Sequence, residues 1–260
     1  MTKGYSHLPL DGFGILITRP IRQAERLAKS IETAGGKPII FPTIEIQAIE
    51  DKTPLLKIIQ NLKDYDLVIF ISANAVEQGM PYIVESNIPL ASLKFAAIGN
   101  ATKKALESYN VKDVIAPSER FDSEALLELS ELQNVASKKI VIFRGETGRE
   151  TLATKLRERG AHVDYAACYR RVIPSIDAQS LGTSWKNGEI NAVSTMSLES
   201  LSNLCDILDS STRHLLFNTP VFVPHPRIAS GAEKMGLLNL HITGTTDEDL
   251  IKDLSQYHAR

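Results

Sequence analysis

The turn RGETGR, residues 144–149, is the stretch of this sequence best suited to binding an anion. It follows the β-branched run Ile140–Phe143, which predicts a buried strand, and it precedes an apolar stripe at helical spacing. A turn that enters a helix offers unpaired backbone N–H groups and the positive end of the helix dipole. Arg144 and Arg149 add guanidinium groups that match carboxylate or phosphate oxygens. An exposed loop with a Glu146–Arg149 ion pair would explain the same residues.

Small or polar residues follow the other predicted strands in the same way. Helix capping explains the serines equally well, and a surface position explains the histidine. Arg19 either binds an acidic ligand or caps a sheet edge. The candidate binding residues are Thr18, Arg19, Ser72, Ala73, Asn74, Gly99, Thr102, Arg144, Gly145, Arg149, Ser197, His225 and Arg227.

Tyr169 is the one candidate for proton transfer, because it lies at the end of a predicted strand that begins near Val163. A phenol at the edge of a sheet can donate a proton to a leaving group. The alternative is that Tyr169 only packs, as most tyrosines in strands do.

Composition excludes several other kinds of function. The 260 residues carry a net charge of -2, which gives no overall attraction to nucleic acid or membrane. The chain has no apolar run near the ~20 residues of a membrane helix. It has no glycine-rich nucleotide-binding motif either. The 2 cysteines lack metal-binding spacing and the 6 histidines are scattered, so we expect no metal and a reduced, cytoplasmic protein.

The sequence contains an internal repeat. Arg19 matches Arg144, 125 residues further along, and Ser72 matches Ser197 at the same offset. Two further blocks follow in the same order at nearly the same offset. A repeat this long predicts two related domains rather than a solenoid.

Strand and helix patterns alternate through both halves, which predicts an α/β fold with parallel sheets and helices on both faces. We expect a strand at Val114–Ala116 and a helix at Glu124–Leu132. The matching segments Pro38–Ile49 and Val163–Ile173 are predicted to be strands that connect the halves. The two prolines of the first segment are typical of an edge or linker strand.

Taken together, the motifs resemble the uroporphyrinogen-III synthase family from about Gly14 to Leu254. The resemblance rests on six segments in order: TRPxxQAxxLA at 18–28, FISANAV at 70–76, AIGNATxxAL at 97–106, RGExGRxxLAxxLxxRGAxV at 144–163, YRR at 169–171 and HPRIAxGAxxxG at 225–236. The chain has Ile71 and Met196 where the family commonly has threonine, which leaves Ser72, Ser197 and backbone N–H groups as donors.

The resemblance implies two Rossmann-like (flavodoxin-like) domains joined by a two-stranded ladder, with the active site in the cleft between them. Domain 1 would contain residues 1–37 and 174–260, domain 2 residues 49–162, and the connecting strands residues 38–48 and 163–173.

The implied reaction is cyclisation of hydroxymethylbilane, an octacarboxylate tetrapyrrole, to uroporphyrinogen III with inversion of the last ring and loss of water. The family uses no metal or cofactor, and Tyr169 matches its tyrosine. A monomer is implied, with transient contact to hydroxymethylbilane synthase. The residues alone would also fit a non-catalytic two-lobed ligand-binding or sensor module, or less well a transferase with a nucleotide-activated donor.

Overall fold

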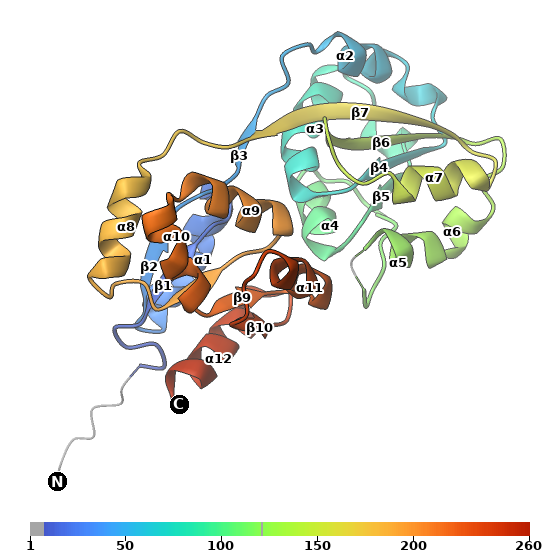
Figure 1. Cartoon of the computed structure of the whole chain (residues 1–260). Coiled ribbons are helices and arrows are strands. Elements are labelled where there is room, and N and C mark those ends of the chain that lie inside the picture. The colour runs from blue at the N-terminus through green and yellow to red at the C-terminus, as the bar shows by residue number, and fades with distance from the viewer. Residues whose placement is uncertain (1–7, 121) are drawn as a thin grey trace. The chain divides into compact units, whose positions relative to one another are not determined.

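The computed structural model describes residues 8–120 and 122–260, and the chain divides into two units (Figure 1). Unit 1 runs up to Glu45 and resumes at Val172, and unit 2 consists of Ile46–Arg171. Each unit has its own five-stranded sheet. The predicted α/β class with parallel sheets is therefore confirmed. Residues 1–7 of the first predicted domain lie outside the described residues.

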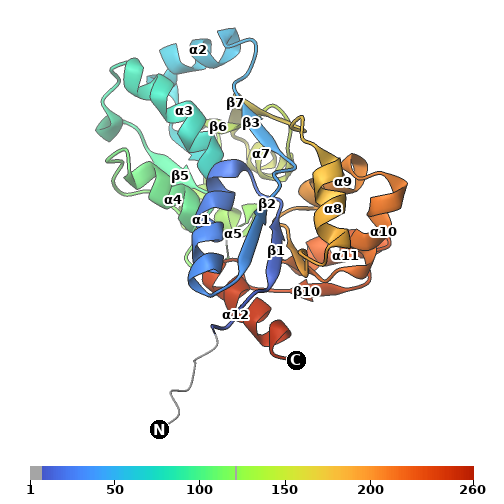
Figure 2. The same cartoon turned by 90° about the vertical axis from the view of Figure 1, so that its left-hand side faces the viewer.

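Unit 1 places helices on both faces of its sheet. Figure 2 shows α1 on one side of β1 and β2 and α8 and α9 on the other. Its elements are β1 (Gly14–Ile17), α1 (Ile21–Thr33), β2 (Lys37–Ile40), α8 (Ala178–Lys186), β8 (Ala192–Ser194), α9 (Leu198–Ile207), α10 (Ser210–Asn218), β9 (Val221–Val223), α11 (Pro226–Lys234), β10 (Leu240–Ile242) and α12 (Asp247–His258).

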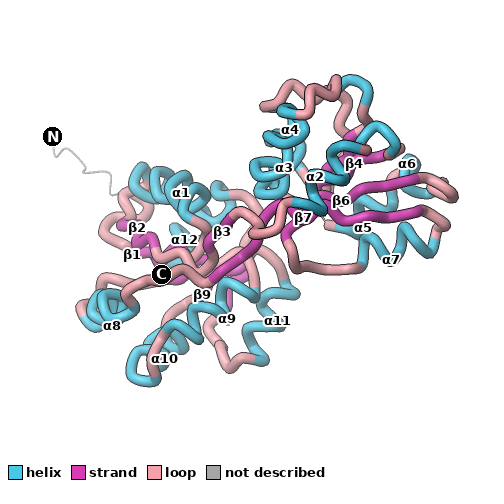
Figure 3. Tube along the Cα trace, turned by 90° about the horizontal axis from the view of Figure 1, so that it is seen from above, coloured by secondary structure: helices cyan, strands magenta, loops and turns pink. Residues whose placement is uncertain are grey.

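Unit 2 is layered in the same way. Figure 3 shows α3 and α4 on one side of its strands and α5 and α7 on the other. Its elements are β3 (Glu45–Gln47), α2 (Thr53–Gln60), the 3-10 turn η1 (Leu62–Asp64), β4 (Leu67–Phe70), α3 (Ala73–Glu85), the 3-10 turn η2 (Leu90–Ser92), β5 (Phe95–Ala97), α4 (Asn100–Glu107), α5 (Ser123–Glu128), α6 (Ser130–Gln133), β6 (Lys139–Gly145), α7 (Thr151–Glu158) and β7 (His162–Val172).

The two sheets use equivalent strands in the same order, which confirms the internal repeat. The order is β2-β1-β8-β9-β10 in unit 1 and β7-β6-β4-β5 in unit 2, with β3 on the other side of β7. A bridge between Ile115 and Ala96 continues the second sheet where β10 continues the first. Counted along unit 1 alone, the order is the flavodoxin-like 2-1-3-4-5. The chain passes between the units inside β3 and at the end of β7, which are neighbours in one sheet.

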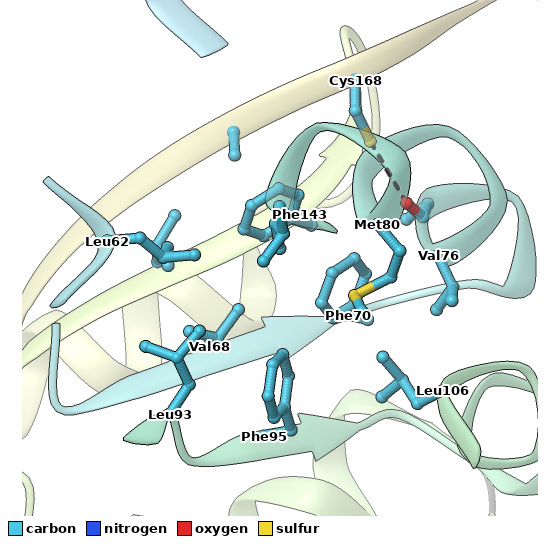
Figure 4. Packing of buried hydrophobic residues seen from close by; sticks show 14 of the residues in the cluster. Leu62, Val68, Phe70, Val76, Met80, Leu93, Phe95, Leu106, Phe143 and Cys168 are labelled. Atoms are coloured by element: carbon cyan, nitrogen blue, oxygen red, sulfur yellow. Dashed lines mark hydrogen bonds between the residues drawn. The ribbon is translucent and has the colours of Figure 1, made fainter. Parts of the chain in front are cut away.

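The strands are buried on both faces, as parallel strands between helix layers must be. In unit 2, Phe70 and Phe143 lie in one hydrophobic cluster and Ile69 and Ile142 in another on the opposite face. The rings of Phe70 and Phe143 stack with centroids 4.6 Å apart beneath α3 (Figure 4). Burial of each such ring contributes roughly 1.5–3 kcal/mol to stability. The stacked pair holds β4 and β6 together close to their carboxyl ends.

Three local predictions differ from the structure. The segment predicted as a single connecting strand, residues 38–48, forms two strands, and β2 pairs with β1 at the edge of the unit 1 sheet. The predicted helix Glu124–Leu132 is interrupted at Leu129, whose ψ of 143° is extended. The predicted strand Val114–Ala116 makes only the single bridge at Ile115.

Candidate active site

In unit 2 the candidate residues gather at the carboxyl edge of the sheet. Ser72 follows β4, Gly99 follows β5, Arg144 and Gly145 end β6, and Tyr169 lies near the end of β7. Because β4, β5, β6 and β7 are parallel neighbours, these residues share one edge. That edge is where ligands of such sheets bind.

Helix N-termini lie at the same edge and supply free backbone N–H groups. The Ser72 Oγ accepts a hydrogen bond of 3.0 Å from the Ala75 N–H and caps α3. Gly99 begins α4 without any side-chain cap, and the next residue, Asn100, is exposed. The first turn of α4 can therefore bind an anion directly. Ala73 and Asn74 are half-buried on the first turn of α3.

Tyr169 is almost completely buried, with 1% of its surface exposed. Its hydroxyl lies 3.3 Å from the Ser72 Oγ and accepts a hydrogen bond of 3.4 Å from the Arg171 guanidinium. Its ring lies against Gly145, where a Cβ would be 2.9 Å from Cε2 of the ring. Glycine at 145 therefore allows the phenol to reach Ser72 at the sheet edge.

Arg144 is held inside unit 2 with 4% exposure. Its guanidinium donates a hydrogen bond of 2.7 Å to the Glu150 carboxylate and lies 4.4 Å from the centre of the Tyr165 ring. The Tyr165 hydroxyl also donates to Glu150. The Tyr165 and Arg144 hydrogen bonds hold the pKa of Glu150 below its usual value. Burial first, and then the hydrogen bond to Glu150, raises the pKa of Tyr165.

The sequence predicts Arg144 and Gly145 in a turn, but both are strand residues. β6 continues to Gly145, which pairs with Tyr169 after a shift of register at Arg144. The long partner strand β7 accounts for this extension, because it supplies backbone partners beyond Phe143. The turn itself begins at Glu146, and Arg149 is exposed in it.

In unit 1, Thr18 and Arg19 follow β1 and are both buried. Thr18 Oγ1 donates to the Ser194 carbonyl and accepts from Ser200 Oγ at 2.9 Å, inside a buried hydroxyl network. Arg19 donates a hydrogen bond of 2.6 Å to Asp247 in the first turn of α12. Both side chains thus have internal partners at the carboxyl edge of their sheet.

Two further helices begin at the unit 1 edge with side-chain caps. Ser197 Oγ accepts from the Ser200 N–H at 3.1 Å and begins α9. His225 Nδ1 accepts from the Arg227 N–H at 3.1 Å and begins α11. His225 and Arg227 are exposed.

Thr102 is buried in unit 2 with 3% exposure. The structure also brings together residues around the candidate arginines that the sequence did not indicate. Glu150, Tyr165 and Asp247 contact the candidate arginines and were not predicted. Glu150 lies only six residues after Arg144, so a contact between the two could have been predicted from the sequence. Asp247 is separated from Arg19 by 228 residues, and no local pattern joins them.

The part of the chain that the structure describes contains neither a cluster of metal-binding side chains nor a membrane-spanning helix. Within 8–120 and 122–260, no group of three or more His, Cys, Asp or Glu side chains could hold a metal ion. In the same part of the chain, no helix is long and apolar enough to cross a membrane.

Fold and site together define a class of protein: an α/β chain of two related parallel-sheet units, each with helix N-termini at its carboxyl edge. The family model described as uroporphyrinogen-III synthase HemD matches residues 25–252. The uroporphyrinogen-III synthase of Salmonella typhimurium is 32% identical over 240 residues, 91% of this chain and 97% of that protein. The Escherichia coli synthase is 30% identical over 239 residues, with the same shares covered. The chain belongs to the uroporphyrinogen-III synthase family, whose members are cyclising hydro-lyases.

Solved structures support the fold. A mutant uroporphyrinogen III synthase from Thermus thermophilus matches with a TM-score of 0.64 and 16% identity, covering 95% of this chain and 98% of that one. The Helicobacter pylori enzyme matches with a TM-score of 0.57 and 16% identity, covering 95% and 99%.

Proposed function

We propose that this protein cyclises hydroxymethylbilane to uroporphyrinogen III, with inversion of the D ring and loss of water. Family membership over residues 25–252 carries this proposal. The polar edges of the two sheets fit it, because the substrate is a polycarboxylate and helix N-termini bind carboxylates.

In the proposed complex, the first turns of α3, α4, α9 and α11 bind substrate carboxylates through backbone N–H groups. Ala73, Asn74, Gly99, Ser197 and Arg227 lie in or next to these turns. Thr18 and Thr102 are buried, so we assign them a supporting role behind the same turns.

Tyr169 is our candidate general acid. Its hydroxyl would give a proton to the hydroxyl of the substrate's hydroxymethyl group, which then leaves as water and generates an electrophilic azafulvene cation. The α-carbon of the last ring that already carries a methylene bridge would attack this cation and give a spiro intermediate. The older bond between that carbon and its bridge would then break, which leaves an azafulvene on the neighbouring ring. The free α-carbon of the last ring would attack this azafulvene and lose its proton, which closes the macrocycle with the ring inverted and replaces the proton that Tyr169 gave. The protein's main contribution would be orientation, which favours this route over direct closure.

We further propose that β3 and β7 form a ladder between two domains, that the substrate contacts both carboxyl edges in a cleft, and that the domains close around it. The duplicated site residues support this arrangement. Small-angle scattering with and without product would test closure, and identical profiles would contradict it.

We also propose a cytoplasmic monomer that receives its unstable substrate through transient contact with hydroxymethylbilane synthase.

A coupled assay tests the function. Hydroxymethylbilane is generated in the presence of the protein, and the oxidised porphyrin isomers are separated. Spontaneous closure gives isomer I, so an excess of isomer III is expected. Isomer I alone, from folded protein, would contradict the proposal and favour a ligand-binding module.

A further inference from the structure

Each unit contains a buried arginine that pairs with a carboxylate. Arg19 follows β1, and Arg144 lies near the end of β6, the equivalent strand of unit 2. Arg19 and Arg144 occupy matching positions of the repeat. Their side chains are 8% and 4% exposed, and each donates to one carboxylate, at 2.6 Å from Asp247 and 2.7 Å from Glu150. In both arginines the Nε atom is buried without a hydrogen-bond partner. The same arrangement has thus formed twice, with carboxylates from unrelated parts of the sequence.

The two partners of the Arg144 pair differ in their freedom to move. Glu150 is 58% exposed, whereas Arg144 is fixed from other directions. The Tyr165 ring covers one face of its guanidinium. Gly148 allows the loop to approach so closely that a Cβ there would lie 2.7 Å from Arg144 Nη2. The guanidinium would therefore keep its position if the Glu150 side chain rotated into solvent.

We propose that Glu150 and Asp247 are internal competitors, which occupy the arginine sites until substrate carboxylates displace them. The inference rests on the proposed function and assigns two of the groups that recognise its anionic substrate. Exchange of one carboxylate for another leaves the buried guanidinium paired throughout, which avoids the cost of an uncompensated buried charge. It also explains why arginines suited to anion binding are already occupied.

Asp247 can leave Arg19 without loss of its helix. α12 is started by a capping box, in which Thr246 and Asp249 satisfy each other's donors. Asp247 is 32% exposed and takes no part in that box. Its removal therefore tests the competitor role separately from helix capping.

The experiment measures the apparent KM for enzymatically prepared hydroxymethylbilane in Glu150→Gln and Asp247→Asn. Both variants remove the competing charge and keep the side-chain shape. We expect each to lower KM by about two- to fivefold, because a substrate carboxylate no longer has to displace a charged partner from the arginine, with little change in kcat. Tyr165→Phe, which loses the hydrogen bond to Glu150 but keeps the ring over Arg144, should lower KM as well.

Glu158→Gln is the matched control. Glu158 is 55% exposed and pairs with Lys155 on α7, so the substitution changes the same charge in the same part of unit 2. Its KM should equal that of the wild type. A raised or unchanged KM in both Glu150→Gln and Asp247→Asn would overturn the inference, because the carboxylates would then be positioning groups or bystanders. A wild type that forms no isomer III would instead overturn the proposed function.

Discussion

At the scale of the residue, the proposed mechanism depends on the hydroxyl of Tyr169, which unit 2 almost completely shields from solvent. A shielded phenol exchanges protons with bulk water slowly and acts best on a group placed against it. Ser72, at 3.3 Å, is its nearest hydroxyl partner. Either of the two hydroxyls can be the donor in this contact.

We expect Tyr169→Phe to lower kcat by about a hundredfold without abolishing turnover, since loss of a general acid costs about 10²- to 10⁴-fold and the orientation of the substrate is kept. The ring packing on Gly145 is kept, so the free energy of unfolding should fall by no more than about 1.5 kcal/mol. The coupled isomer assay and urea denaturation measure the two effects. Tyr65→Phe is the control, because Tyr65 donates to Asp164 within the same unit. Full activity of Tyr169→Phe would remove Tyr169 from the mechanism.

Gly145→Ala should displace the ring of Tyr169 while leaving its hydroxyl group in place as a chemical group. The added methyl group would lie 2.9 Å from Cε2 of Tyr169, inside van der Waals contact. The ring must shift, at a cost of about 1–3 kcal/mol in stability. We expect a loss of kcat in the isomer assay, with stability followed by urea denaturation. Unchanged kcat and stability would show that the ring position is not critical.

Cys168 lies beside the same residues but should be chemically inert. Its sulfur lies 3.3 Å from the Arg144 carbonyl oxygen and 3.5 Å from the Ala75 carbonyl oxygen, and either oxygen can accept the single thiol proton; the contact with Ala75 is drawn in Figure 4. Burial raises the pKa of Cys168 to about 12, so the thiolate is scarce at about pH 8. We expect iodoacetamide to modify Cys168 only after unfolding, as measured by mass spectrometry. Rapid alkylation of the native protein at that pH would contradict the burial.

At the scale of the element, helix caps connect stability to ligand binding. Ser197→Ala removes the side-chain cap of α9 and should cost about 1 kcal/mol of unfolding free energy. If the first turn of α9 binds a carboxylate, KM should also rise. Asp209→Ala is the comparison, because Asp209 caps α10, which does not follow a strand. It should lower the melting temperature and leave KM unchanged. Equal KM values in the two variants would separate α9 from the substrate.

The elements also show what the sequence can predict. The type and place of Ser72 predict the helix cap that it forms, and Pro38 is expected on an edge strand, where β2 lies. On both sides of the interruption at Leu129, Arg159 donates hydrogen bonds from the end of α7 to the carbonyls of Leu127 and Leu132. No local window contains that interaction. The same limit applies to Asp247 and Arg19, which only the folded sheet brings together.

At the scale of the whole molecule, the hydrophobic clusters divide as the units do. The two clusters of unit 2 contain only residues between Ile46 and Arg171, and the two clusters of unit 1 contain none of them. Unit 2 is one continuous segment, whereas unit 1 is assembled from both ends of the chain. Unit 1 must therefore await synthesis of the C-terminal segment, while unit 2 has its complete core earlier.

This division predicts that a fragment of residues 45–172, which includes all of β3 and β7, folds alone. Its size is typical of an independent domain, and its sheet loses no strand. We expect a cooperative urea transition by circular dichroism and by tyrosine fluorescence, with coincident midpoints. The fragment of residues 1–45 is the control and should remain unfolded, because β1 would lack its partner β8. A non-cooperative transition of the 45–172 fragment would mean that unit 2 needs unit 1 for its stability, despite a core built entirely from its own residues.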